Sequence, residues 1–268
     1  MEQLERIAHE GAALVGSVAG PVRFGFTERG GGVSRAPYAS LNLGLHVGDD
    51  ARAVAENRRR ALALLGAEDL ASALFVPRQV HGNHVVVLSD ASPAALRRAH
   101  AEAERGADAV VCSIPEVPVL LNFADCVPVI LTCGDAFAVV HSGWKGTYAR
   151  VALEAARTLA EVAGRPPGAV RAYIGPHITG AEYEVSADLL DRFEGQFGEA
   201  CHGTAPRMLD LSACIRLALV EAGVPEGDVF DTGLSTVSQN DRFFSYRAEG
   251  GVCGRHGAVA VLRPDASF

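Results

Sequence analysis

The sequence predicts one α/β (α+β) domain over residues 1–268, with a mixed β-sheet core and helices packed outside it. Three observations support this fold class. Four short β-rich apolar runs follow one another in the middle of the chain, and helix-like segments lie on both sides of them. No internal repeat or low-complexity linker divides the chain. Hydrophobic residues make up 49% of the sequence, which is enough for a sizeable core.

The first hundred residues predict short strands interspersed with helices. Asp49 or Asp50 can cap a helix that Gly66 would end, so a helix is expected at Asp50–Leu65. Met1–Glu10 is expected to be a frayed or helical surface segment. The other elements predicted here are strands at Val22–Phe26, Leu74–Val76 and Val85–Leu88 and a helix at Pro93–Glu104.

The four central runs are nearly continuous in apolar character, which predicts strands that are buried on both faces. They are Ala109–Cys112, Val117–Phe123, Val127–Thr132 and Phe137–Val140. The remainder of the chain predicts helices at Thr147–Val162, Ser186–Phe197 and Leu211–Ala222, and strands at Val170–Ile174, Val229–Thr232, Phe243–Tyr246 and Ala258–Leu262.

Composition excludes several partners and compartments. The formal net charge is −8, and an acidic surface repels nucleic acid and anionic lipid, so neither is expected as a main partner. No apolar run is long enough to cross a bilayer, and the acidic start does not resemble a signal peptide, so a cytoplasmic location is expected. The six scattered cysteines predict free thiols, and Cys112, Cys133 and Cys214 are expected to be buried. Protein partners cannot be predicted.

Polar residues interrupt the apolar runs at three places. Asp125–Cys126 separates two buried runs, His141 ends a strand before a glycine-framed loop, and His81 precedes Gly82 at another strand edge. Two imidazoles and one thiolate suit zinc and leave a fourth position open for water or substrate. A single histidine or cysteine near a core is more often a packing residue than a metal ligand, and the long gaps between these three match no zinc-finger spacing.

A series of motifs in the same order resembles the YfiH-like laccase-domain family. The resemblance extends from about Phe24 to Leu262. The motifs are Thr27–Ser34, Ser40–Gly44, His46–Asp50, Glu56–Arg58, Gln79–Gly82, Ala107–Ala109, Ala124–Pro128, His141–Gly146, Ile174–Pro176 and Phe243–Arg247.

This resemblance implies a single catalytic domain of the CNF/YfiH-like type, in which His81, Cys126 and His141 bind zinc. It also implies phosphorolysis of adenosine, inosine, guanosine and methylthioadenosine, with adenosine deamination as a second reaction. Older descriptions of the family as polyphenol oxidases make copper an alternative metal. One departure is visible, since Ser235–Thr236 stands where relatives often have a Cys-Thr pair.

Phosphorolysis requires groups that bind phosphate, ribose and the departing base. Arg58, Arg29 and Arg247 are candidates for phosphate because a guanidinium matches two oxygens, and Lys145 can add positive charge. Solvated or ion-paired surface positions are the alternatives for these cations. The candidates for other roles are Asn42, His46 and Gln79 for substrate binding, Asp125 for orienting a ligand or transferring a proton, and Trp144 for stacking a purine, each with local packing as the alternative. His177 is expected on a surface loop.

Three further functions remain open. Cys126 could be a nucleophile with His141 as its base, which would make the protein a cysteine hydrolase. A copper-dependent phenol oxidase is the second, although the nine histidines show no paired pattern. The third is a binding module without catalysis, which would not need an open metal position.

Overall fold

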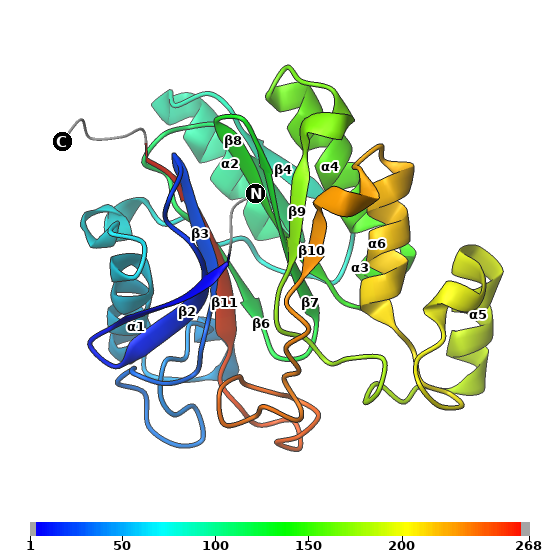
Figure 1. Cartoon of the computed structure of the whole chain (residues 1–268). Helices are drawn as coiled ribbons and strands as arrows, with labels where there is room; N and C mark the ends of the chain where they lie inside the picture. Colours follow the sequence, from blue (N-terminus) through cyan, green and yellow to red (C-terminus); the bar gives the residue numbers. More distant parts are fainter. Residues whose placement is uncertain (1–3, 264–268) are drawn as a thin grey trace.

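The computed structural model describes residues 4–263 and has four layers, in the order helix, sheet, sheet, helices (Figure 1). One sheet is antiparallel, with the order β1 (Glu5–His9), β2 (Ala12–Ser17), β3 (Val22–Thr27), β11 (His256–Leu262) and β6 (Val119–Phe123). The other has the order β10 (Val229–Asp231), β9 (Arg171–Ile174), β7 (Val127–Cys133), β8 (Ala136–Ser142), β5 (Ala109–Cys112) and β4 (Val85–Leu88).

The six-stranded sheet is mixed, because β10–β9 and β4–β5 are parallel pairs and its other pairs are antiparallel. This confirms the predicted α/β class, although the core consists of two sheets instead of one. The central strands β5 to β8 are buried along almost their whole length, as the continuous apolar runs predict. The helices are α1 (Ala51–Ala63), α2 (Pro93–Arg105), α3 (Trp144–Tyr148), α4 (Val151–Val162), α5 (Ala187–Phe197) and α6 (Leu211–Glu221).

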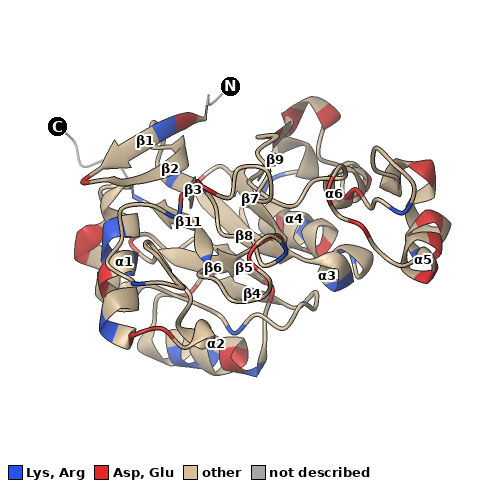
Figure 2. Cartoon of the chain, turned by 90° about the horizontal axis from the view of Figure 1, so that it is seen from below, with Lys and Arg blue, Asp and Glu red and all other residues tan. Residues whose placement is uncertain are grey.

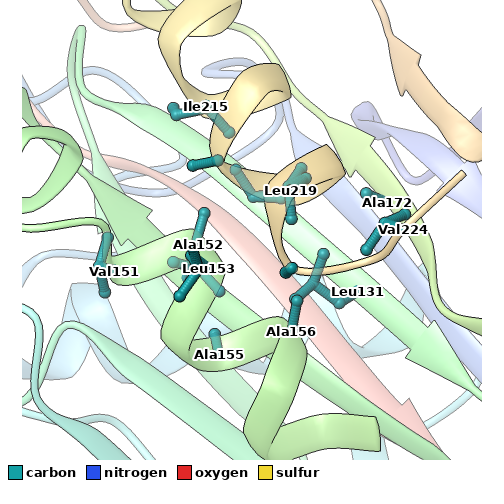
Figure 3. Close-up of a cluster of buried hydrophobic side chains, with 14 of the residues drawn as sticks. Leu131, Val151, Ala152, Leu153, Ala155, Ala156, Ala172, Ile215, Leu219 and Val224 are labelled. Carbon is teal, nitrogen blue, oxygen red and sulfur yellow. The ribbon is translucent and has the colours of Figure 1, made fainter. Parts of the chain in front are cut away.

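Hydrophobic clusters join the layers. Figure 3 shows the cluster in which α4 and α6 pack on the six-stranded sheet, with Leu131, Ala156 and Leu219 among its members. A second cluster fills the space between the two sheets, and a third joins the five-stranded sheet to α1. Burial of this apolar surface stabilises the fold by about 25 cal/mol per Å² removed from water. It also holds the ends of β6, β7 and β8 in fixed positions.

Charged side chains gather on the outer helices α1, α2 and α5, whereas the strands between them carry few (Figure 2). Asp50 caps α1 as predicted, and its carboxylate accepts hydrogen bonds from the backbone N–H groups of Arg52 and Ala53. All six cysteines are free, and Cys112, Cys133 and Cys214 are buried as predicted. Within residues 4–263, every helix is too short or too polar to serve as a membrane span.

Four predicted elements differ in the structure. Glu5–His9 is an edge strand paired with β2, not a helical or frayed segment, and Met1–Gln3 lies outside the described residues. Its exposed side chains give no apolar alternation, so the sequence carries little sign of this pairing. The predicted helix Thr147–Val162 is divided between α3 and α4, because Arg150 adopts the left-handed conformation with φ of 60°.

The other two differences concern predicted strands. Phe243 and Phe244 are fully buried, but their segment is irregular and forms no strand. Their apolar character therefore indicates burial and not a strand. In Leu74–Val76, only Phe75 forms a bridge, to Val119 of β6.

Candidate metal centre and its cavities

The three predicted metal ligands meet at one end of the two-sheet sandwich. Cys126 lies in the turn between β6 and β7, where the chain passes from one sheet to the other, and His141 lies near the end of β8. His81 is in the loop before β4. Their ligand atoms all lie within 4.8 Å of one another, so the fold unites residues that are distant in sequence.

The turn that carries Cys126 has an unusual backbone conformation. Asp125 has a φ of 92°, which L-residues rarely adopt. Its carboxylate accepts hydrogen bonds from the Thr236 hydroxyl at 2.7 Å and from the Arg247 backbone N–H at 2.7 Å. Asp125 therefore holds the turn that places the Cys126 thiol, and Thr236 of the divergent Ser-Thr pair supports it.

Asp108 connects the two histidines. It is fully buried, and its Oδ1 lies 2.8 Å from His141 Nδ1. The same carboxylate accepts hydrogen bonds from the backbone N–H groups of Val80, His81 and Gly82 at 3.2, 2.9 and 2.7 Å. These contacts stabilise the His81 loop, where His81 has a φ of 60°, and they orient the His141 ring.

The electrostatics of the centre favour a thiolate. Burial raises the pKa of the Cys126 thiol, but the charge of His141 and the hydrogen bonds from both histidines outweigh it and lower that pKa. Burial lowers the pKa of His141, whereas Cys126 and Asp108 raise it overall. A thiolate beside two imidazoles is a donor set that zinc accepts.

Gly143 leaves room for the side chains of Cys126 and His81 to approach each other closely. A Cβ atom at this position would lie 2.9 Å from Cys126 Sγ and 3.0 Å from His81 Cδ2. Any residue other than glycine would therefore push the thiol and the imidazole apart. The space around the three side chains and their chemistry both fit a metal ion.

A cavity of about 800 Å³ opens beside the centre, and its lining carries an excess of positive charge, with three arginines that include Arg78 against one carboxylate, Glu104. Arg58 and Arg255 line it, together with His46, and neither arginine forms an ion pair with any of residues 4–263. Arg58 Nε donates to the Leu43 carbonyl at 3.0 Å, while Arg255 donates to the carbonyls of Cys253 and Gly254. Burial lowers the pKa of His46, and the positive charges of Arg255 and Arg58 lower it further.

A second cavity of about 390 Å³ also borders the centre and is more aromatic. Trp144 and Tyr183 line it, with Ile178 and Leu211. The two cavities share His81, Cys126 and Tyr246, so the candidate metal centre lies between a cationic and an aromatic compartment.

The other predicted substrate residues are distributed unevenly. Gln79 lines the larger cavity, but its carboxamide pairs with the backbone of Asn122, at 2.8 and 2.9 Å. Arg247 and Asp125 line the smaller cavity. Asn42 is fully buried, and its Oδ1 accepts a hydrogen bond from the Arg255 backbone N–H at 2.8 Å, which makes it a support for that arginine.

Asn42 lines neither cavity, and the same is true of Arg29, Lys145 and His177. The guanidinium of Arg29 forms an ion pair with Glu249, and Lys145 is exposed beside Trp144. The expectation of a surface position for His177 is wrong, because its side chain is buried and its Nδ1 lies 2.8 Å from the Gly175 carbonyl.

Sequence reasoning assigned no role to Asp108 or Arg255. Asp108 stands directly before the buried run Ala109–Cys112, and a carboxylate next to a fully buried strand is a signal that could have identified it. Arg255 precedes the last strand and is separated from Arg58 by nearly 200 residues, so only the fold relates the two.

The four-layered fold and the His–Cys–His centre between two cavities define the class of this protein as an α/β protein with a candidate metal site. The chain belongs to the family described as multi-copper polyphenol oxidoreductase laccase, whose model matches residues 23–263. This result confirms the resemblance inferred from the motifs.

Relatives and solved structures agree with this assignment. A purine nucleoside phosphorylase of Corynebacterium glutamicum is 34% identical over 252 residues, which cover 92% of this chain and 96% of that protein. Another, of Deinococcus radiodurans, is 37% identical over 245 residues, or 88% of each chain. The crystal structure of the hypothetical protein YfiH from Bacillus licheniformis has a TM-score of 0.85 at 29% identity, covering 96% of this chain and 98% of that one.

Proposed function

We propose that this chain is a cytoplasmic, zinc-dependent purine nucleoside phosphorylase that functions as a single catalytic domain. Its proposed substrates are adenosine, inosine, guanosine and methylthioadenosine together with phosphate, and adenosine deamination is proposed as a second reaction. The observation that carries the proposal is a cationic cavity directly beside the His–Cys–His centre, in a chain whose relatives are named purine nucleoside phosphorylases.

Phosphorolysis breaks the bond between the ribose C1′ atom and a purine nitrogen and forms a bond from C1′ to a phosphate oxygen. The two cavities suit the two halves of this reaction. Arg58 and Arg255 provide guanidinium groups for the phosphate, and Trp144 and Tyr183 provide aromatic surface for the purine. The pentose would then lie between them, next to the centre.

The residues of the chain itself supply binding and orientation in this proposal. Zinc held by His81, Cys126 and His141 would supply Lewis-acid chemistry when it is bound. Asp108 keeps the His141 ring in one orientation, and Asp125 keeps the Cys126 turn in place. Zinc is preferred to copper because the site has one thiolate and two imidazoles and no further histidine within the described cluster.

A cysteine hydrolase is a second candidate, and one observation favours it. Asp108, His141 and Cys126 form an acid–imidazole–thiol series in which the thiolate is favoured, and such a series can also activate a nucleophile. This alternative needs no metal and leaves His81 outside the series, where its hydrogen bond only helps to lower the pKa of Cys126. Metal content and the effect of a His81 substitution therefore separate the two functions.

The proposed function is tested by incubating the purified, zinc-loaded protein with inosine and phosphate. Hypoxanthine and ribose 1-phosphate are expected in equal amounts, and omission of phosphate should stop base release. Adenosine without phosphate should yield inosine and ammonia if the deaminase reaction is present. Absence of phosphate-dependent base release from all four nucleosides would contradict the phosphorylase proposal.

The cationic cavity leads to a prediction for Arg58 and Arg255. Replacing either with methionine, which keeps much of the apolar stem, should raise the KM for phosphate by roughly tenfold to a hundredfold, because a charge-assisted hydrogen bond is lost. The measurement is initial rate against phosphate concentration at saturating inosine. Arg59→Met is the matched control, since Arg59 is an exposed neighbour on α1 that pairs with Glu56 and does not line the cavity.

A further inference from the structure

Asn122 has a buried side chain that the contacts described above do not explain. It lies on β6 and is only 6% exposed, yet it lines the larger cavity. Its Oδ1 is buried and has no hydrogen-bond partner among the described residues. A buried oxygen without a partner costs free energy, so such a group in a cavity wall indicates a ligand that satisfies it.

The backbone around Asn122 is held rigidly. Gln79 Oε1 accepts a hydrogen bond from the Asn122 backbone N–H at 2.8 Å, and Gln79 Nε2 donates to the Asn122 carbonyl at 2.9 Å. On its other side, the strand pairs with β11 at Gly257. The carboxamide therefore projects from a fixed strand, as an efficient binding group should.

Strand geometry places this side chain near the cations. Side chains alternate along β6, so Asn122 projects to the same side as Leu120, which packs in the cluster with Leu41 and Leu43 beneath α1. The Leu43 carbonyl accepts the hydrogen bond from Arg58, and the Leu43 N–H donates to the Arg255 carbonyl at 2.9 Å. The Asn122 carboxamide thus belongs to the part of the cavity wall that adjoins the cationic cluster.

The unpartnered atom is an acceptor, and this decides which part of a substrate it can contact. A carbonyl oxygen cannot bind the three bare oxygens of HPO₄²⁻, because neither partner carries a hydrogen, and the single hydroxyl of that ion is its only donor. It needs a hydroxyl or an N–H group. Trp144 and Tyr183 do not line the cavity that Asn122 lines, so the donor that we assign to it is a sugar hydroxyl and not a purine N–H group.

We propose that Asn122 is a further substrate-binding residue that accepts a hydrogen bond from a hydroxyl group of the pentose. The assignment rests on the phosphorylase function proposed above. It makes Asn122 a determinant of specificity for hydroxylated over deoxygenated sugars, and it makes Gln79 a positioning residue that acts through Asn122.

The test compares inosine with 2′-deoxyinosine and 3′-deoxyinosine at saturating phosphate, for wild-type protein and Asn122→Leu. The ratio of kcat/KM for inosine to that for one deoxynucleoside should fall by roughly tenfold in the variant, which is the effect of one lost hydrogen bond. The same ratio is measured for wild-type protein and for the variant. The intrinsic reactivity of each deoxynucleoside therefore cancels when the two ratios are compared. Metal content and thermal midpoint are measured on the same samples.

Two further variants distinguish the loss of the acceptor from the loss of the folded structure. Asn122→Ala adds no bulk. Its ratio of kcat/KM for inosine to that for one deoxynucleoside should also fall, and it replaces the leucine variant if that protein does not fold. Asn122→Asp keeps the acceptor, so its selectivity ratio should stay within about twofold of wild type even if its phosphate affinity falls. Thr232→Val is the matched control, because it removes another buried oxygen without a partner that lines neither cavity.

The outcomes separate the two proposals. A wild-type protein that releases no base from any nucleoside overturns both. A wild-type protein that is active, with Asn122→Leu and Asn122→Ala leaving both ratios unchanged or lowering all three substrates equally, overturns the Asn122 assignment alone.

Discussion

Replacing Cys126 with alanine is expected to remove the bound metal and to lower kcat/KM for phosphorolysis by roughly a thousandfold or more. Cys126 provides the only thiolate of the candidate centre, and its charge lies within 4.8 Å of both imidazoles. Charge stabilisation by a metal is worth several kcal/mol, and about 4 kcal/mol corresponds to roughly a thousandfold in rate. Elemental analysis and steady-state kinetics on the same preparation measure the two effects together.

Cys133→Ala is the matched control for this variant. Cys133 is a buried free thiol at the far end of β7, the strand that begins next to Cys126. Its removal should lower the free energy of unfolding modestly and leave metal content unchanged. Metal-loaded and active Cys126→Ala protein would refute the assignment of the centre.

His81 separates a metal enzyme from a cysteine hydrolase. In the metal centre His81 is a ligand, so His81→Ala should lose metal and activity together. In an acid–imidazole–thiol series of Asp108, His141 and Cys126, His81 is only an auxiliary hydrogen-bond partner of the thiolate, so its loss should lower activity only in part. Retained activity in metal-free His81→Ala protein would favour the hydrolase, provided that Cys126→Ala is inactive.

Replacing Asp108 with asparagine is the second change with a large expected effect. The carboxylate accepts four hydrogen bonds, three from backbone N–H groups and one from His141, and all of them are lost or weakened when one oxygen becomes an NH₂ group. Metal affinity should fall by about 10- to 100-fold, because groups that orient a ligand histidine typically contribute that much. The free energy of unfolding should fall by about 3 kcal/mol, as expected for the loss of a buried charged network.

Metal affinity is measured by competition with a chelator, and stability by denaturant unfolding of the metal-free protein. Glu28→Gln is the control, because Glu28 is another buried carboxylate, held by Arg6 and Arg242, that lines neither cavity. It should lose stability without losing metal affinity. An Asp108→Asn protein whose metal affinity equals that of wild type would show that Asp108 is only structural.

Much of the fold could be predicted because its elements carry local signals. Continuous apolar runs identified β5 to β8, and Asp50 with Gly66 marked the ends of the first helix region. The prediction failed where the deciding interaction is not local. The hairpin of β1 and β2 depends on main-chain pairing at an exposed edge, and the break at Arg150 depends on one backbone conformation.

The candidate site likewise contains residues that the sequence could identify and residues that only the fold revealed. The sequence by itself selected His81, Cys126 and His141 as candidate metal ligands, because of their chemistry and the motifs around them. Only the tertiary structure decided that Asp108 holds both histidines, that Arg58 and Arg255 face one cavity, and that Asn122 presents an oxygen without a partner. The physical reason is that residue chemistry is local, whereas distance, burial and the satisfaction of hydrogen bonds depend on how the two sheets pack against each other.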